Sequence, residues 1–129
     1  MVIVKEVNWF DENKYDADVI ITDGKIEIPT FCSPCHYKVG DEVKDVGILD
    51  YIDIEKLETE PVNIENPVYK PSTKTYLVKG QIVNYKKKGS MGNDVDLKIG
   101  NIIIDFGRIP GDIQDGDWVL VEISRFDLI

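Results

Sequence analysis

The sequence predicts an all-β protein, and the balance of its apolar residues is the main reason. The chain of 129 residues contains 18 Ile and 14 Val but only 6 Leu and a single Ala, Ala17. β-branched side chains pack well on a pleated sheet and lose rotamer freedom in a helix, whereas Ala and Leu favour helices. Alternation of apolar and polar residues over 94–99 and 119–123 also predicts strands with one buried face.

Four short matches in the same order predict an internal duplication. Residues 2–7 resemble 76–82, residues 16–21 resemble 94–99, residues 26–28 resemble 102–104, and residues 39–43 resemble 115–119. Each half is therefore expected to contain a long first strand, a loop, a hairpin, a second loop and a closing strand pair. Asp23-Gly24 and Gly100-Asn101 are the expected hairpin turns, because Asp, Asn and Gly accept the positive φ of tight turns.

The predicted domain organisation is a first small β-barrel over 1–58, a connector over 59–74 and a second small β-barrel over 75–129. Pro61, Pro67 and Pro71 lie between the halves and remove backbone donors, so this segment is expected to be extended rather than a central strand. Residues 50–58 fit either a strand or one helical turn.

Charge is distributed unevenly along the chain, whose net charge is −9. Residues 1–58 carry 6 Lys or Arg and 14 Asp or Glu, whereas residues 75–129 carry 7 and 8. An electronegative first half repels phosphates and can speed association with a basic protein surface. A plain solubilising role for the acidic residues is the competing interpretation.

The cellular location is predicted from two sequence signals. No apolar run approaches the roughly 20 residues that a membrane span needs. The first residues, Met1-Val2-Ile3-Val4-Lys5-Glu6, do not form a basic segment followed by an apolar stretch. A cytoplasmic protein with no membrane partner is therefore expected, and its oligomeric state is left open.

The stretch 112–123, which contains Asp115-Gly116-Asp117, looks like the entry to the fourth strand of an OB-fold, particularly of the S1-like RNA-binding subtype, and SH3-like barrels use similar turns. Gly80 also suits a first strand that bends sharply to serve both sheets. The resemblance implies two tandem small OB/SH3-like barrels, each with a binding face on strands two and three flanked by the loop after strand one.

The loop after the first strand of the second half is the candidate nucleic-acid site. It places Tyr85 beside Lys86, Lys87 and Lys88, and a basic tip with an aromatic ring suits single-stranded nucleic acid. A Lys-rich tip that keeps a hairpin edge soluble is the competing interpretation. The neighbouring face predicts weak stacking, because Asp94, Asp96 and Lys98 supply no aromatic ring.

The corresponding loop of the first half is acidic and argues against a shared nucleic-acid role. We expect Asp11, Glu12, Asp16 and Asp18 to contact a basic protein partner.

The motif Cys32-Ser33-Pro34-Cys35-His36 has four interpretations: c-type haem attachment, a thioredoxin-like redox pair, half of a zinc site shared between subunits, and a reduced thiol pair in a loop. Haem attachment would need an export signal, which is not seen, and a thioredoxin-like pair would need a helix after the motif. A zinc site would need further ligands, which this chain does not supply. The expectation is a reduced, metal-free pair on a surface turn that the fold does not need. No cofactor is expected.

No catalytic motif stands out. A lone His36 supplies no second histidine for a metal triad, and no Gly-x-Ser-x-Gly, Walker or Rossmann pattern occurs. The sequence therefore predicts a non-enzymatic protein-binding module, for example an inhibitor or immunity-type protein that covers a basic surface. The alternative is a single-stranded nucleic-acid binder that uses Tyr85 and the three lysines.

Overall fold

The computed structural model describes residues 1–85 and 94–129 and confirms an all-β fold. Within this part of the chain there are eleven strands and no helix. The strands are β1 (Ile3–Trp9), β2 (Ala17–Thr22), β3 (Glu27–Cys32), β4 (Val46–Ile48), β5 (Tyr51–Lys56), β6 (Val68–Lys70), β7 (Thr75–Val83), β8 (Asp94–Ile99), β9 (Ile102–Arg108), β10 (Trp118–Ile123) and β11 (Phe126–Leu128). Among the described residues, no helical segment has the length and apolarity needed to cross a bilayer.

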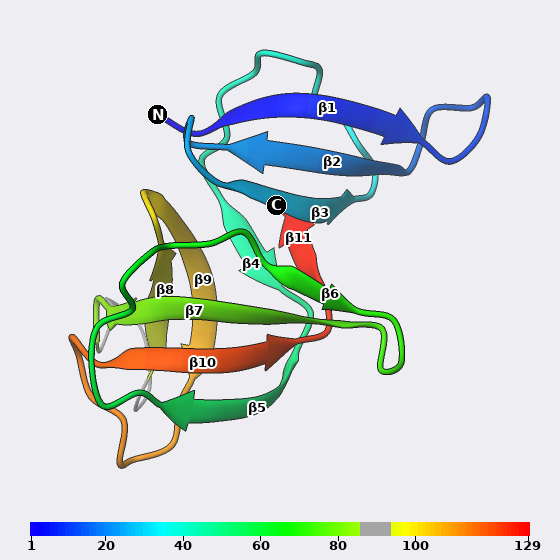
Figure 1. The fold of residues 1–129 in the computed structure, drawn as a ribbon. Helices are drawn as coiled ribbons and strands as arrows, with labels where there is room; N and C mark the ends of the chain where they lie inside the picture. The colour runs from blue at the N-terminus through cyan, green and yellow to red at the C-terminus, as the bar shows by residue number, and fades with distance from the viewer. Residues whose placement is uncertain (86–93) are drawn as a thin grey trace.

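The strands form a single sheet that is not closed into a barrel (Figure 1). Its order is β1-β2-β3-β11-β4-β9-β8-β7-β10-β5, with β6 paired to β7 beside this path. The expectation of two separate tandem barrels is not confirmed. The reason is an exchange of strands, since β4 pairs with β9 and β11 pairs with β3, so each half supplies a strand to the other.

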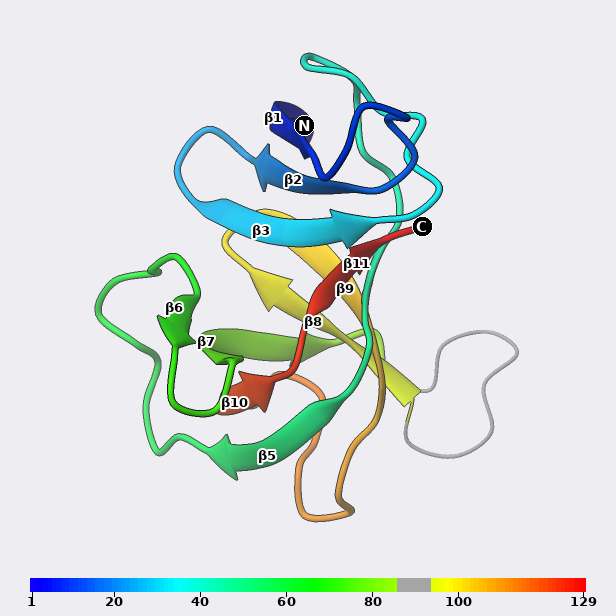
Figure 2. The same ribbon diagram turned by 90° about the vertical axis from the view of Figure 1, so that its right-hand side faces the viewer.

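Three further connections join the two halves. β4 and β11 pair antiparallel at the middle of the sheet, and β5 pairs antiparallel with β10 at one end. The carboxylate of Asp23 also accepts a hydrogen bond of 2.9 Å from the backbone N–H of Asn101, which links the two hairpin turns. Figure 2 shows β11 and β9 between the β1–β3 layer and the strands below it.

The predicted alternation positions the core as expected. Val95, Leu97 and Ile99 of β8 are fully buried, and the residues between them are half-buried. The buried residues of β10 continue this core. The two-residue turn at Gly100-Asn101 is confirmed, and residues 51–56 form a strand rather than a helical turn.

Both Gly-Asp turns have the same hydrogen-bonded geometry. Gly40 and Gly116 have φ of 94° and 88°, a left-handed conformation that glycine adopts without strain. Within each turn, the Asp carboxylate accepts a hydrogen bond from a backbone N–H three residues earlier: Lys38 to Asp41 Oδ2 at 2.9 Å, and Gln114 to Asp117 Oδ2 at 2.8 Å. The backbone carbonyl of the same Asp accepts from the first strand, from Val4 N–H in one half and Ile82 N–H in the other, both at 2.8 Å. The glycine N–H donates back to the carbonyl of that strand residue, Gly40 to Val4 at 2.8 Å and Gly116 to Ile82 at 2.7 Å. Each turn therefore docks on the first strand of its own half in the same way.

β7 changes its partner around Gly80. Residues 75–77 pair with β6, whereas residues 81–83 pair with β8. An added Cβ at Gly80 would lie 2.8 Å from the carbonyl oxygen of Lys98 and 2.9 Å from Leu97 Cδ1. The close approach of β8 thus requires glycine at this position of the strand.

Candidate binding groove

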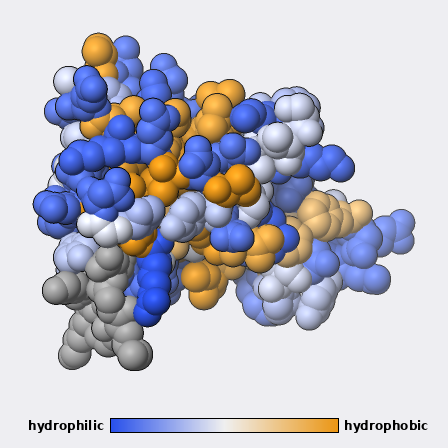
Figure 3. All heavy atoms as spheres, turned by 90° about the horizontal axis from the view of Figure 1, so that it is seen from below, coloured by the Kyte–Doolittle hydropathy of each residue, from blue (hydrophilic) through white to orange (hydrophobic). Residues whose placement is uncertain are grey.

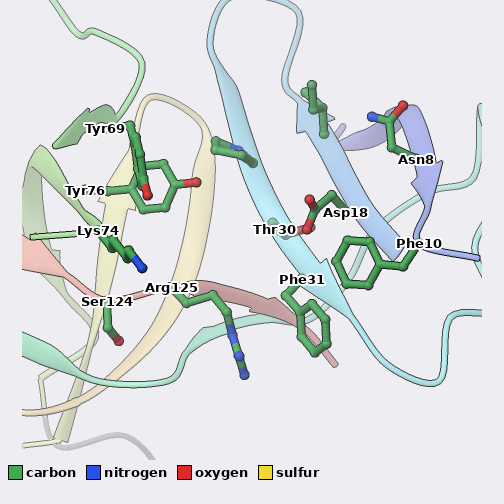
Figure 4. Close-up of a pocket in the computed structure, with 12 residues that line it drawn as sticks. Asn8, Phe10, Asp18, Thr30, Phe31, Tyr69, Lys74, Tyr76, Ser124 and Arg125 are labelled. Atoms are coloured by element: carbon green, nitrogen blue, oxygen red, sulfur yellow. The ribbon is translucent and has the colours of Figure 1, made fainter. Parts of the chain in front are cut away.

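A groove of about 490 Å³ lies between two walls of different origin (Figure 4). One wall is the face of β1, β2 and β3, and the other is built by β6, the start of β7 and the connection between β10 and β11. Its lining residues are Asn8, Phe10, Asp18, Ile20, Pro29, Thr30, Phe31, Tyr69, Lys74, Tyr76, Ser124 and Arg125. We call this feature the aromatic groove.

Aromatic rings occupy both walls of the aromatic groove. Phe10 stacks on Phe31 with ring centroids 5.9 Å apart, and Tyr69 lies 5.1 Å from Tyr76 in a tilted pair. Phe10 is 57% exposed and Tyr69 is 49% exposed, so these rings offer free surface. Tyr76 is held from behind by the buried ring of Phe126, at 5.9 Å. The groove thus presents positioned aromatic faces to solvent.

The guanidinium of Arg125 lies across one of these rings. Its central carbon is 4.4 Å from the centroid of Phe31, within the range of a cation–π contact. Asp127 accepts two hydrogen bonds from it, at 2.6 Å from Nε and 3.2 Å from Nη2. This hydrogen bonding raises the pKa of Arg125, against the opposing effect of burial. Arg125 is therefore fixed in place and its charge is compensated by Asp127.

Asp18 and Lys74 are the charged groups of the groove without such a partner. Within the described residues, neither the Asp18 carboxylate nor the Lys74 ammonium makes a hydrogen bond or an ion pair. Removal of water from around Asp18 raises its pKa. Burial raises the pKa of Tyr76, and the charge of Asp18 and the neighbouring Tyr69 raise it further. Asp18 is thus an uncompensated acid beside aromatic rings.

The four predicted partner-binding acids fall into separate positions. Asp18 lines the groove, whereas Asp11 accepts a hydrogen bond of 3.0 Å from the backbone N–H of Asn13 and so shapes its own loop. Asp16 accepts a hydrogen bond from the hydroxyl of Ser33. Glu12 is exposed in the loop between β1 and β2. The structure brings Asp18 alone of the four into the groove.

The predicted nucleic-acid loop is only partly described. Lys86, Lys87 and Lys88 lie outside the described residues. Tyr85 is half-buried against the core, and its backbone N–H donates to Asp115 Oδ1 at 3.1 Å. Tyr85 does not line the aromatic groove.

The expectation of a reduced thiol pair on a surface turn is wrong. Cys32 and Cys35 form a disulfide, and they are only 3% and 6% exposed. Cys32 ends β3, and the backbone N–H of Cys35 donates to the carbonyl of Tyr15 at 2.7 Å. The disulfide loop therefore holds the loop between β1 and β2 that carries Phe10. No group of three or more His, Cys, Asp or Glu in the described part of the chain could hold a metal ion.

Exposed apolar side chains elsewhere are scattered. Leu49, Ile52, Val62 and Val68 are more than half exposed. Seen from below, hydrophobic atoms form small patches separated by hydrophilic ones (Figure 3). Single exposed apolar residues are normal on protein surfaces, whereas a hollow lined by several rings favours a binding site.

Sequence reasoning missed most of the aromatic groove. Tyr69, Lys74 and Arg125 come from segments far from β1–β3 in the chain, and only the exchange of strands brings them there. One local signal was present at Phe31. Ile28, Thr30 and Cys32 are buried, so the alternation places an aromatic side chain on the outward face of β3.

Comparisons of this chain with protein-family models, with curated proteins and with solved structures give no match. No relative therefore suggests an activity, and the function has to be inferred from the groove, the charge distribution and the topology.

Proposed function

We propose that this protein is a non-enzymatic binding module that recognises a basic protein surface. The partner inserts a Lys or Arg side chain into the aromatic groove, where Asp18 neutralises it. The observation that carries this proposal is the unpaired Asp18 carboxylate beside Tyr76 and the Phe10–Phe31 pair. A cation over an aromatic face, next to a partly desolvated carboxylate, gains from both contacts.

The charge of the surrounding surface supports the same partner. The net charge of −9 arises mainly from residues 1–58, which supply β1–β3 and so one wall of the groove. The acidic loop with Asp11, Glu12 and Asp16 follows β1 directly, and Phe10 connects it to the groove. Such a surface steers a basic partner toward the groove at low salt. A small inhibitor or immunity-type protein that covers a basic surface fits this description.

The test measures the affinity of a labelled peptide for the whole chain. An Arg-containing Gly/Ser peptide should bind at low salt, and a Glu-containing peptide of the same length should not. Asp18→Asn should weaken binding of the Arg peptide about five- to tenfold, which corresponds to about 1 kcal/mol for a partly exposed charge pair. Asp53→Asn is the matched control, because Asp53 is exposed on β5 and lies outside the groove. Equal losses in the two variants would contradict the proposal.

A single-stranded nucleic-acid binder remains the second candidate, and the aromatic lining of the groove favours it. Single-stranded nucleic-acid sites typically combine aromatic rings, which stack on the bases, with cationic side chains such as Lys74 and Arg125. Asp127 offsets Arg125 and Asp18 opposes a phosphate, so the protein partner is preferred. If nucleic acid binds here, Asp18→Asn should tighten binding of a labelled oligo(dT). Loss of binding on replacing Lys86, Lys87 and Lys88 by Ala would place that site in the predicted loop instead.

We also infer that the two halves arose by duplication of one small β unit. The Gly-Asp turns match bond for bond, and the order β1-β2-β3-β11 from one end corresponds to β7-β8-β9-β4 in the other half. The face of β8 and β9 that corresponds to the β2–β3 wall carries Asp96, Lys98, Ile103 and Asp105 and no aromatic ring. We therefore assign recognition to the groove between β1–β3 and the segments packed opposite them, which are β6, the start of β7 and the β10–β11 connection.

The disulfide bears on the expected cytoplasmic location. Disulfides persist mainly in oxidising compartments and are rare in the cytosol. The Cys32–Cys35 bond therefore favours a compartment outside the cytosol for the oxidised form.

A further inference from the structure

The aromatic groove continues into two adjoining hollows. A second hollow of about 450 Å³ shares Phe31 and Arg125 with the groove. A third, of about 300 Å³, shares Pro34, Leu128 and Ile129 with the second. The three hollows thus follow one another from the β2–β3 face along β11.

We infer that the partner presents an extended peptide segment, with a cationic side chain at Asp18 and an apolar side chain in the second hollow. This inference rests on the proposed function and adds the conformation of the partner and a second specificity site. An extended chain advances about 3.3 Å per residue and points alternate side chains to the same face, so it can fill neighbouring hollows.

The second hollow combines the polar residues Ser33, Arg125 and Asp127 with an apolar portion that could accept a partner's side chain. Pro34, Leu128 and Ile129 line it, and Ile129 is 70% exposed. The charged residues at its border, Arg125 and Asp127, neutralise each other through two hydrogen bonds. These two charges therefore offset each other, and an apolar side chain would cover Ile129 and Pro34.

The Arg125–Phe31 contact separates the two subsites and fixes their spacing. Its guanidinium is anchored by Asp127 on β11, and Phe31 pairs with the same residue across the β3–β11 contact. The two residues that form the boundary are thus tied to β3 and β11, the strands on either side of the contact. A bound segment should therefore place its cation and its apolar residue at one preferred separation.

The experiment uses the whole chain and a series of Gly/Ser peptides that each contain one Arg. A parent peptide has no apolar residue, and eight derivatives carry one Leu placed two to five residues before or after the Arg. We expect one spacing to bind about tenfold more tightly than the parent, which is the effect of burying much of one Leu side chain. Other spacings should bind like the parent.

Variants separate this inference from the proposed function. Ile129→Asn should remove the gain from Leu and leave the affinity for the parent peptide unchanged. Val62→Asn is the matched control, since Val62 is 97% exposed and lines none of the three hollows. Asp18→Asn should weaken every peptide, including the parent. Thermal melting of each variant verifies that it is folded.

The inference would be overturned if all Leu spacings bound with the same affinity, or if Ile129→Asn kept the tighter binding of the preferred Leu peptide. The proposed function would still stand in either case if Asp18→Asn weakened binding of the parent peptide. Failure of the parent peptide to bind at low salt would overturn the proposed function itself.

Discussion

Asp18 combines an exposed position with a raised pKa, and both properties determine how it responds to pH. Loss of surrounding water disfavours its charged form in the folded protein. Because the folded pKa lies above the ordinary value of 3.8, the folded state holds its proton more tightly than the unfolded state in the window above 3.8. Stability due to this group therefore falls as pH rises through that window. Ionised Asp18 therefore does not stabilise the fold, which agrees with the recognition role proposed above.

The first prediction follows from the upward direction of the Asp18 pKa shift. Binding of the Arg peptide should weaken as pH is lowered toward the raised pKa of Asp18, at a higher pH than for an ordinary aspartate. At pH 7, Asp18→Asn should melt at the wild-type temperature or slightly above it, while its affinity is reduced. Calorimetric titration and thermal melting of the same samples measure both effects. A marked fall in the melting temperature of Asp18→Asn would show that the carboxylate supports the fold instead.

The second prediction concerns Cys32 and Cys35. Thiol titration of the denatured protein, purified without reductant, should find no free thiol, and two after reduction. The Cys32→Ser/Cys35→Ser variant should lose about 2 kcal/mol of unfolding free energy from the missing four-residue cross-link. Buried hydroxyls add to this loss, because both positions are nearly inaccessible. Reductant should lower the wild-type melting temperature and leave that of the variant unchanged. Two free thiols before reduction would contradict the disulfide.

At the level of single elements, β7 depends on one glycine. Gly80→Ala would place a methyl group against the Lys98 carbonyl and the Leu97 side chain. We expect a loss of about 1–3 kcal/mol, the usual cost of overpacking, measured by urea unfolding. Gly111→Ala is the matched control, because no atom lies within 4 Å of an added Cβ there and its φ is not in the left-handed region. Equal stabilities of the two variants would show that β8 yields to the extra methyl group.

The elements were largely predictable because local pattern determines them. Alternating residues identified β8 and β10, and Gly100-Asn101 identified a turn, since both signals act within a few residues. Pairing between distant strands was not predictable. β4 and β11 have only three residues each. Such short strands carry no pattern that indicates whether they pair with a strand of their own half or of the other half. The second wall of the groove depends on that pairing and was missed for the same reason.

For the whole molecule, the exchange of strands predicts one cooperative unit rather than two domains. β4, β5 and β11 all pair with strands of the other half. Trp9 lies in β1 and Trp118 in β10, so each tryptophan reports on one half. Single-tryptophan variants made with Trp9→Phe and Trp118→Phe should unfold at the same urea concentration, as in a two-state transition. Residues 1–58 and residues 75–129, produced separately, should each remain unfolded.

Two separate midpoints in these variants, or a folded fragment, would contradict a single cooperative unit. A shared midpoint would also explain why a groove built from both halves keeps its shape. Opening of either half would dismantle one wall, so the open form could not hold a ligand across both.

The β4–β11 pair has a geometric property of its own. Ile48 opposes Phe126, Gly47 opposes Asp127 and Val46 opposes Leu128, so the two backbones are related by a local two-fold axis at the Gly47–Asp127 pair. A contact of this kind is the one that two identical subunits make across a two-fold axis. If the halves are duplicates, the present chain corresponds to a symmetric homodimer whose subunits have been joined by residues 59–74. The tether frees the two former subunits to diverge, and an asymmetric ligand can then be recognised at a site that a symmetric dimer would have to present twice.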